Sequence, residues 1–194
     1  MKIAINGFGR IGRLVYRIME NDPFFDVVAI NDLSSSEELA YLLKYDSNLR
    51  NYDEEVTYDE EGIVVEGKKV KVYAEKDPKL LPWKELGVDL VFECTGRFTK
   101  EEDAKMHLEA GAKKVLVSAP CKGNVKTVVY GVNEDVIEES YEFAIKKFGK
   151  NGYATTKMYV EDKKYKEYLD ELQRLIDNKQ EYILRARKVL SNLR

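Results

Sequence analysis

Short apolar runs alternate along the first 130 residues with segments whose apolar positions recur every three or four residues. Apolar runs of this length predict buried strands, and the longer periodic segments predict helices between them. Strands that alternate with helices are typical of a parallel sheet with helical crossovers, so we expect a doubly wound α/β fold. The predicted strands are Lys2–Asn6, Phe25–Asn31, Val88–Glu93, Lys114–Ser118 and Lys126–Tyr130, and the predicted helices span 10–20, 35–45 and 99–110.

Short sequence motifs indicate where two of the helices begin, and one segment departs from the alternation of strands and helices. Ser35 with Glu38, and Thr99 with Glu102, have the spacing of capping boxes at helix N-termini. Between the second helix and the third parallel strand, residues 55–74 predict short antiparallel strands. Their turns are expected at Glu61-Gly62 and Glu66-Gly67.

The composition changes near residue 137. Residues 1–137 carry a net charge of -6, whereas residues 138–194 carry +3 and contain no Pro, Cys, His or Trp. We therefore divide the chain into an α/β domain, 1–137, and a Lys/Tyr-rich, mostly helical segment, 138–194. From about Glu161 the segment has apolar residues at heptad spacing, with Lys179 at one polar position. The apolar heptad positions are Leu172, Ile176, Ile183, Ala186, Leu190 and Leu193.

Three interpretations of this C-terminal segment remain open. A helical cover for the sheet is favoured, and self-association as a homodimer through the heptad positions comes next. A nucleic-acid surface is the third, but acidic residues are interspersed among the lysines and tyrosines, which argues against it. The origin of the segment is equally open between a natural truncated relative and a chimera.

Overall composition excludes several classes of protein. The 194 residues are 44% hydrophobic, which is too apolar for a disordered chain, and the net charge of -3 gives no basic field for nucleic acid or an anionic membrane. No apolar run approaches a membrane span of about 18 residues, and no signal peptide is evident. Two cysteines and one histidine form neither a disulfide framework nor a four-ligand zinc site. We expect a soluble, cytoplasmic protein without a metal.

A glycine-rich loop follows the first predicted strand and opens the first helix. Gly7-Phe8-Gly9-Arg10-Ile11-Gly12 has the G-x-G-x-x-G spacing that lets a backbone turn tightly and approach a pyrophosphate at a helix N-terminus. Asp32 ends the second strand 20 residues after Gly12. A carboxylate there accepts hydrogen bonds from a ribose and repels a 2′-phosphate, so the pair predicts NAD rather than NADP. The fold is thus expected to be Rossmann-like.

Further motifs resemble one enzyme family in order and spacing across residues 1–135. The chain is similar to the NAD-binding domain of glyceraldehyde-3-phosphate dehydrogenase. The matching runs are Asn6-Gly-Phe-Gly-Arg-Ile-Gly-Arg13, Asn31-Asp32, Leu43-Lys-Tyr-Asp-Ser47, Leu81-Pro-Trp83, Glu93-Cys-Thr-Gly-Arg-Phe-Thr99, His107-Leu-Glu-Ala-Gly-Ala-Lys-Lys-Val115, Ser118-Ala-Pro120 and Tyr130-Gly-Val-Asn133.

The resemblance implies a role in NAD binding for residues at several strand ends. Arg10 and Ile11 would lie at the pyrophosphate, Asp32 at the adenosine ribose, and Lys76 near the adenine. Thr95, Gly96 and Phe98 would line the adenine side, and Ser118 and Ala119 the nicotinamide side. The full set of expected cofactor-binding residues is Asn6, Gly7, Phe8, Gly9, Arg10, Ile11, Gly12, Asn31, Asp32, Lys76, Thr95, Gly96, Arg97, Phe98, Ser118 and Ala119.

The chain departs from the family pattern at several places. Asn48-Leu49-Arg50 stands where the family usually has Val-His-Gly. The family's oxidoreductase chemistry, a step of glycolysis, needs a thiolate in a Ser-Cys-Thr-Thr-Asn run and a histidine base further on, and neither is present. The segment most similar to the Ser-Cys-Thr-Thr-Asn run is Ala154-Thr155-Thr156-Lys157. No catalytic residue is therefore assigned.

The two thiols and the imidazole are poor substitutes for that machinery. Cys94 ends an apolar strand, which indicates a core or cofactor-wall position. Cys121 is expected to be exposed, with an ordinary pKa near ~8.5 and little reactivity. His107 lies on the third predicted helix with no oriented partner evident from the sequence, which favours a structural role.

Three hypotheses of function follow. The first is a nucleotide-binding module that holds NAD(H) without turnover. The second is an oxidoreductase completed by another chain or by unexpected chemistry of Cys121. The third is a scaffold protein whose C-terminal helix mediates assembly.

Overall fold

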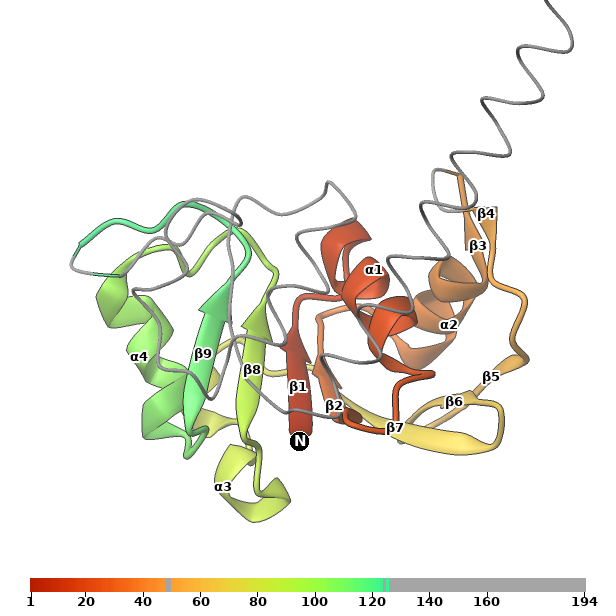
Figure 1. Cartoon of the computed structure of the whole chain (residues 1–194), viewed down its shortest axis with the longest axis horizontal. Coiled ribbons are helices and arrows are strands. Elements are labelled where there is room, and N and C mark those ends of the chain that lie inside the picture. The colour runs from red at the N-terminus through yellow and green to blue at the C-terminus, as the bar shows by residue number, and fades with distance from the viewer. Residues whose placement is uncertain (48–49, 124, 126–194) are drawn as a thin grey trace, which may run out of the picture.

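The computed structural model describes residues 1–47, 50–123 and 125, and these residues form a seven-stranded sheet beside a two-stranded one (Figure 1). The order in the large sheet is β5-β6-β7-β2-β1-β8-β9. Its strands are β1 (Lys2–Asn6), β2 (Asp26–Asn31), β5 (Val56–Asp59), β6 (Gly62–Val65), β7 (Lys68–Tyr73), β8 (Leu90–Glu93) and β9 (Lys114–Val117).

Parallel pairing joins five of these strands. β1 pairs with β2 on one side and β8 on the other, β2 pairs with β7, and β8 with β9, all in parallel. β5, β6 and β7 pair antiparallel, and Gly67, at φ +76°, turns β6 into β7. The predicted Rossmann-like α/β fold is confirmed, as is the antiparallel insertion between residues 55 and 74.

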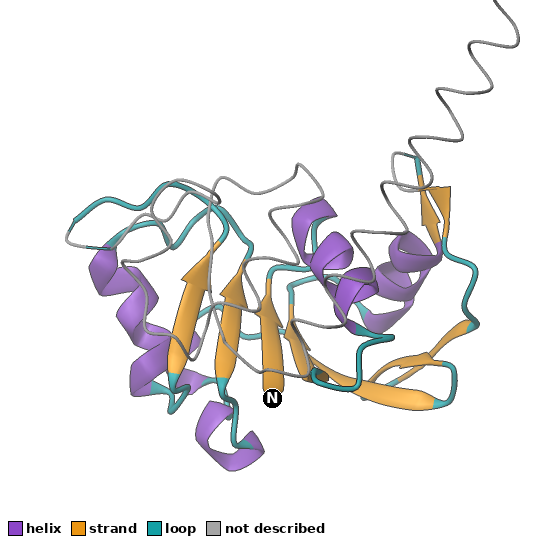
Figure 2. Cartoon of the chain, in the orientation of Figure 1, coloured by secondary structure: helices purple, strands orange, loops and turns teal. Residues whose placement is uncertain are grey.

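Helices connect the parallel strands (Figure 2). α2 begins with the predicted capping box, in which the Ser35 hydroxyl accepts from the Glu38 N–H and the Glu38 carboxylate accepts from the Ser35 N–H. The described helices are α1 (Arg10–Met19), α2 (Ser36–Lys44), the short α3 (Trp83–Leu86), α4 (Glu101–Glu109) and a 3₁₀ turn, η1 (Pro78–Leu80).

The predicted helices 10–20, 35–45 and 99–110 each differ from the observed bounds by one or two residues, and two of these differences have a clear cause. α4 starts after Lys100 with no side-chain cap, because Lys100 forms a parallel β-bridge with Lys122 and moves the helix start one residue beyond the expected Thr99 cap. α2 ends at Lys44 rather than Tyr45, because Tyr45 pairs with Asn51 in the small sheet of β3 (Tyr45–Asp46) and β4 (Arg50–Asn51).

Alternating side chains give each face of the large sheet its own core. On one face, Ile3 and Ile5 of β1 pack with residues of α1 and α2, such as Tyr16 and Leu39. On the other, Ala4 packs in a cluster that contains Trp83 at the start of α3. Helices that cover opposite faces define the doubly wound arrangement.

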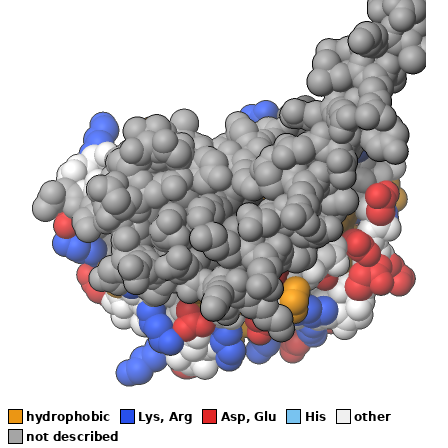
Figure 3. All heavy atoms as spheres, in the orientation of Figure 1, with side chains coloured by type: hydrophobic (Ala, Val, Ile, Leu, Met, Phe, Trp, Pro, Cys, Tyr) orange, Lys and Arg blue, Asp and Glu red, His pale blue; other side chains and the backbone are white. Residues whose placement is uncertain are grey.

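Basic and acidic side chains lie interspersed along the lower edge of the face in Figure 3, among the described residues. Within the described ranges, no helix has the length and apolarity to cross a membrane. The predicted strand at 126–130, the boundary at 137 and the whole of 138–194 lie outside the described residues.

Candidate dinucleotide site

A cleft of about 660 Å³ opens where the carboxyl ends of β1, β2, β7 and β8 meet. The chain leaves β1 toward one face of the sheet and β8 toward the other, so the cleft lies at a topological switch point, where open α/β sheets bind ligands. Its lining residues are Asn6, Gly7, Gly9, Asn31, Asp32, Leu33, Glu75, Lys76, Cys94, Thr95, Arg97 and Phe98.

The loop between β1 and α1 is tight because neither Gly7 in the loop nor Gly12 in α1 leaves room for a side chain. Gly7 has φ +89°, and a Cβ there would lie 2.7 Å from the backbone nitrogen of Thr95. A Cβ on Gly12 would overlap the carbonyl oxygen of Gly7, so α1 can lie against the loop only with glycine at this position. These are the turn and packing roles that the glycine spacing predicts.

Gly9, unlike Gly7 and Gly12, has room for a side chain. A Cβ there would meet no atom of the described residues within 4 Å, although Gly9 lines the cleft. Gly9 is also the N-cap of α1, which has no side-chain cap and no acidic residue in its first turn. The positive end of the helix dipole and the first N–H groups of α1 therefore lie beside open space, which suits a phosphate anion.

The carboxylate of Asp32 lies at the edge of the cleft beside this loop. Asp32 Oδ2 accepts the backbone N–H of Phe8 at 2.7 Å, and Oδ1 accepts the N–H of Ser34 at 3.1 Å. Each oxygen retains acceptor capacity for a ligand hydroxyl. The loop and the end of β2 are thereby held in one arrangement.

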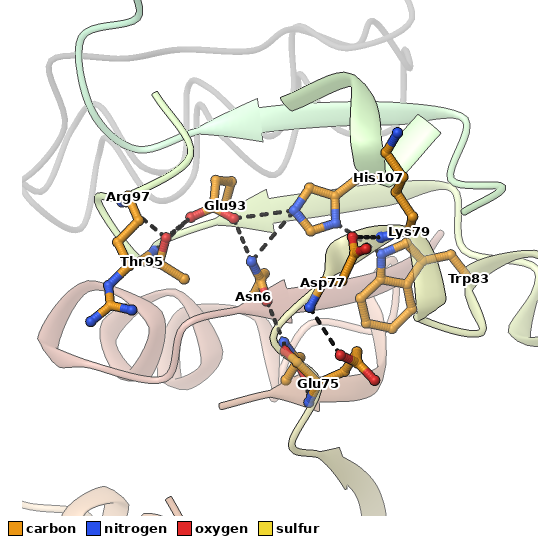
Figure 4. Close-up of polar contacts among 10 residues, drawn as sticks. Asn6, Glu75, Asp77, Lys79, Trp83, Glu93, Thr95, Arg97 and His107 are labelled. Atoms are coloured by element: carbon orange, nitrogen blue, oxygen red, sulfur yellow. Dashed lines mark hydrogen bonds and ion pairs between the residues drawn. The ribbon is translucent and has the colours of Figure 1, made fainter. Parts of the chain in front are cut away.

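Polar side chains behind the cleft connect its walls (Figure 4). Asn31 donates to Asn6 Oδ1 at 2.7 Å and exchanges two hydrogen bonds with the backbone of Glu75. Asn6 in turn donates to the buried carboxylate of Glu93, which also accepts from the N–H and the hydroxyl of Thr95.

Nine of the sixteen residues expected from the sequence line the cleft together. The other seven lie elsewhere: the Phe8 side chain is buried, Arg10 and Ile11 are exposed at the start of α1, and Gly12 packs beneath the loop. Gly96 follows Thr95 with φ +71°, and Ser118 and Ala119 follow β9, the neighbour of β8.

Three lining residues were not among the sixteen: Leu33, Glu75 and Cys94, of which only Cys94 was expected at a core or cofactor-wall position. Each is adjacent in sequence to an anticipated residue, so the loops were found correctly but not every position in them. Leu33 has 55% of its surface exposed and adds an apolar contact area at the Asp32 edge.

Neither thiol has the properties of an activated nucleophile. Burial raises the pKa of the Cys94 thiol to about 12. Cys121 is half-buried rather than exposed, and its pKa is raised rather than ordinary, because burial and then the charge of Glu93 disfavour its thiolate. Among the described side chains, no group of three or more His, Cys, Asp or Glu is placed to hold a metal ion.

His107 is a buried core residue. It is fully buried on α4, and its ring contacts Glu93 on one side and the indole of Trp83 on the other. The structural role expected for it agrees with this position.

A glycine loop that meets an uncapped helix start, with a carboxylate at the end of the next strand, defines a dinucleotide-binding Rossmann domain. Comparison with known proteins gives the family. The model of the family described as glyceraldehyde 3-phosphate dehydrogenase, NAD binding domain, matches residues 1–101. The chain belongs to this family, and its cofactor is NAD.

Individual relatives match a longer part of the chain than the 101 residues of the family model. Glyceraldehyde-3-phosphate dehydrogenase of Thermotoga maritima is 54% identical over 142 residues, which are 72% of this chain and 43% of the relative. The enzyme of the same name from Geobacillus stearothermophilus is 56% identical over 135 residues, 70% of this chain and 40% of the relative. The chain thus spans about two fifths of the length of these relatives.

Proposed function

We propose that this chain binds NAD(H) in the cleft through the residues predicted from its sequence. The observation that carries the proposal is that one cleft joins the uncapped start of α1 to the carboxylate of Asp32. The N–H groups of Arg10 and Ile11 would hold the pyrophosphate beside Gly9. Asp32 would accept the hydroxyls of the adenosine ribose.

The remaining strand ends fit the two ends of the dinucleotide. Leu33 and Lys76 lie on the Asp32 side of the cleft and would contact the adenine together with Phe98. Thr95 lies against Gly7 of the phosphate loop, and Asn6 lines the same cleft. Ser118 and Ala119 would contact the nicotinamide end, as the family resemblance implies.

Binding without turnover by this chain is the second part of the proposal. Oxidation of an aldehyde by this family's chemistry requires a thiolate nucleophile. The chain has two thiols, and burial raises the pKa of both, so neither supplies a thiolate near neutral pH. The relatives are named glyceraldehyde-3-phosphate dehydrogenase, so the alternative is an oxidoreductase in which another chain supplies the catalytic residues.

Two further expectations belong with this proposal. Both cysteines are unpaired, which suits a reducing cytoplasm. The heptad positions of residues 172–193 would support a homodimer, and a scaffold role would follow if the cleft did not bind NAD. Sedimentation across a concentration series tests the dimer, which requires a mass that rises with concentration.

Competition among fragments of the cofactor tests the binding proposal. The full chain is titrated with NAD, ADP-ribose and nicotinamide mononucleotide by calorimetry. We expect ADP-ribose to bind almost as tightly as NAD, because the described contacts lie on the adenosine and pyrophosphate side. Nicotinamide mononucleotide binding as tightly as NAD would contradict this assignment. Steady NADH formation from glyceraldehyde 3-phosphate and phosphate, lost in Cys121→Ser, would favour the enzyme alternative.

A further inference from the structure

The buried carboxylate of Glu93 does not line the cleft, yet both walls of the cleft connect to it. It is 1% exposed at the end of β8. On one side Oε1 accepts the N–H of Thr95 at 2.7 Å and the Thr95 hydroxyl, which itself accepts the N–H of Arg97. The wall that contains Thr95 and Arg97 is thereby tied to Glu93.

The opposite wall is reached through two asparagines. Oε2 of Glu93 accepts from the Asn6 amide, and Asn6 Oδ1 accepts from Asn31 at 2.7 Å. Asn31 then bonds both the N–H and the C=O of Glu75, at 2.8 and 2.9 Å, next to Lys76. A continuous chain of hydrogen bonds therefore runs behind the cleft from the Thr95 wall to the Glu75 wall.

The indole of Trp83 fixes the tautomer of the His107 ring, which is the remaining hydrogen-bond partner of the Glu93 carboxylate. An indole N–H can only donate, and Trp83 Nε1 lies 3.0 Å from His107 Nδ1, so Nδ1 must be the acceptor. The proton of the neutral ring is then on Nε2, which lies 3.1 Å from Glu93 Oε2 and donates to it. Glu93 thus accepts four hydrogen bonds, the full capacity of a carboxylate.

We propose that Glu93 is a positioning residue for the dinucleotide cleft: its carboxylate couples the Thr95 wall to the Glu75 wall, and Trp83 and His107 hold it in place from behind. The inference rests on the proposed binding of NAD in this cleft. It predicts that a residue with no ligand contact sets the affinity for the adenosine half of the cofactor.

Glu93→Gln in the full chain tests the coupling. The amide keeps the shape but places an N–H₂ group among donors, so it cannot satisfy both sides. We expect the dissociation constants of NAD and of ADP-ribose to rise together by about tenfold. The ¹⁵N resonances of the Asn31 side chain and the Glu75 amide, on the far wall, should shift. Wild-type affinities with unchanged far-wall resonances would overturn the proposal.

Asp89→Asn is the matched control. Asp89 immediately precedes β8 and accepts from the Lys2 N–H and the Lys113 ammonium at the opposite end of the sheet. This carboxylate is lost from the same strand region without touching the cleft. NAD affinity should be unchanged, and a fall equal to that in Glu93→Gln would contradict a specific role for Glu93.

Trp83→Phe tests the same coupling while leaving the Glu93 carboxylate in place, and it is used if Glu93→Gln does not fold. The variant removes the N–H that His107 Nδ1 accepts, while the Glu93 carboxylate still accepts from Nε2. The ¹⁵N resonance of Nδ1 should therefore shift with the proton remaining on Nε2, and NAD should bind about threefold more weakly. An unchanged Nδ1 resonance with wild-type affinity would overturn the proposal. If the wild-type chain does not bind NAD, the proposed function fails separately, and the Nδ1 and far-wall resonances still decide the coupling.

Discussion

Asp32 Oδ2 accepts the backbone N–H of Phe8 at 2.7 Å, so the carboxylate assigned to the ribose also fixes the phosphate loop. Two parts of the dinucleotide site, 24 residues apart in sequence, are therefore set by one hydrogen bond. A change at Asp32 should affect both.

Asp32→Ala should weaken NAD binding by at least about tenfold, because charge-assisted hydrogen bonds to the ligand and the bond to the loop are lost together. Discrimination against NADP should fall as well, since no carboxylate remains to repel the 2′-phosphate. Calorimetric titrations with both cofactors measure the two effects. Asp26→Ala, at the start of the same strand, is the control and should leave both affinities unchanged.

Gly9→Ala and Gly12→Ala should separate binding from stability. A Cβ on Gly9 meets no atom in the part of the chain that the structure describes, so the unfolding free energy should change by less than about 1 kcal/mol. NAD affinity should fall, because the methyl group enters the cleft. A Cβ on Gly12 overlaps the Gly7 carbonyl and should cost about 3 kcal/mol of stability. Urea unfolding and calorimetry check both. Similar stability losses in the two variants would be inconsistent with this loop geometry.

The buried ion pair of Arg13 and Asp46 should be a sensitive point of the fold. Arg13 reaches Asp46 Oδ2 at 2.7 Å and the Phe8 carbonyl at 3.1 Å, with both partners buried. Asp46→Ala leaves the Arg13 charge buried and should lower the unfolding free energy by about 3 kcal/mol. Replacing both partners, as in Arg13→Met with Asp46→Leu, should recover much of that loss. A double variant no more stable than Asp46→Ala would argue against charge burial as the cause.

Cys94 should react slowly with alkylating reagents at neutral pH. Burial raises the pKa of Cys94 to about 12, so its alkylation in the folded chain should become appreciable only in strongly alkaline buffer. The unfolded thiol ionises near its ordinary value of 9.0, whereas the folded one stays protonated up to about pH 12. The stability that this difference contributes is fully present below pH 9 and is lost as the pH rises toward 12. Iodoacetamide labelling rates of Cys121→Ser, which retains Cys94, test this, and rapid labelling at pH 7 would refute it.

Much of the fold was predictable because its signals are local. Ser35 and Glu38 cap α2 through groups three residues apart, and the glycine spacing around Gly9 encodes a turn and a helix start in six residues. The Thr99 cap failed because a non-local bridge, between Lys100 and Lys122, fixes the backbone there. Local patterns do not report such pairings.

The residues that line the cleft were largely predictable from the sequence, whereas the hydrogen bonds behind the cleft were not. The contact of Trp83 with His107 joins residues 24 positions apart, and the contact of Asn6 with Glu93 joins residues 87 apart. Neither spacing carries a periodic or motif signal, and a lone histidine without an evident partner is ordinarily a core residue. The short α3 that positions Trp83 was also missed, because four residues are too few for helical periodicity to show.

Calorimetric titration of the full chain with NAD, with Asp32→Ala in parallel, tests directly whether this cleft binds the cofactor. We expect saturable binding with one site per chain that weakens by at least about tenfold in the variant. Absence of binding to the wild-type chain, or equal affinity in the two proteins, would contradict the assignment of this cleft to NAD.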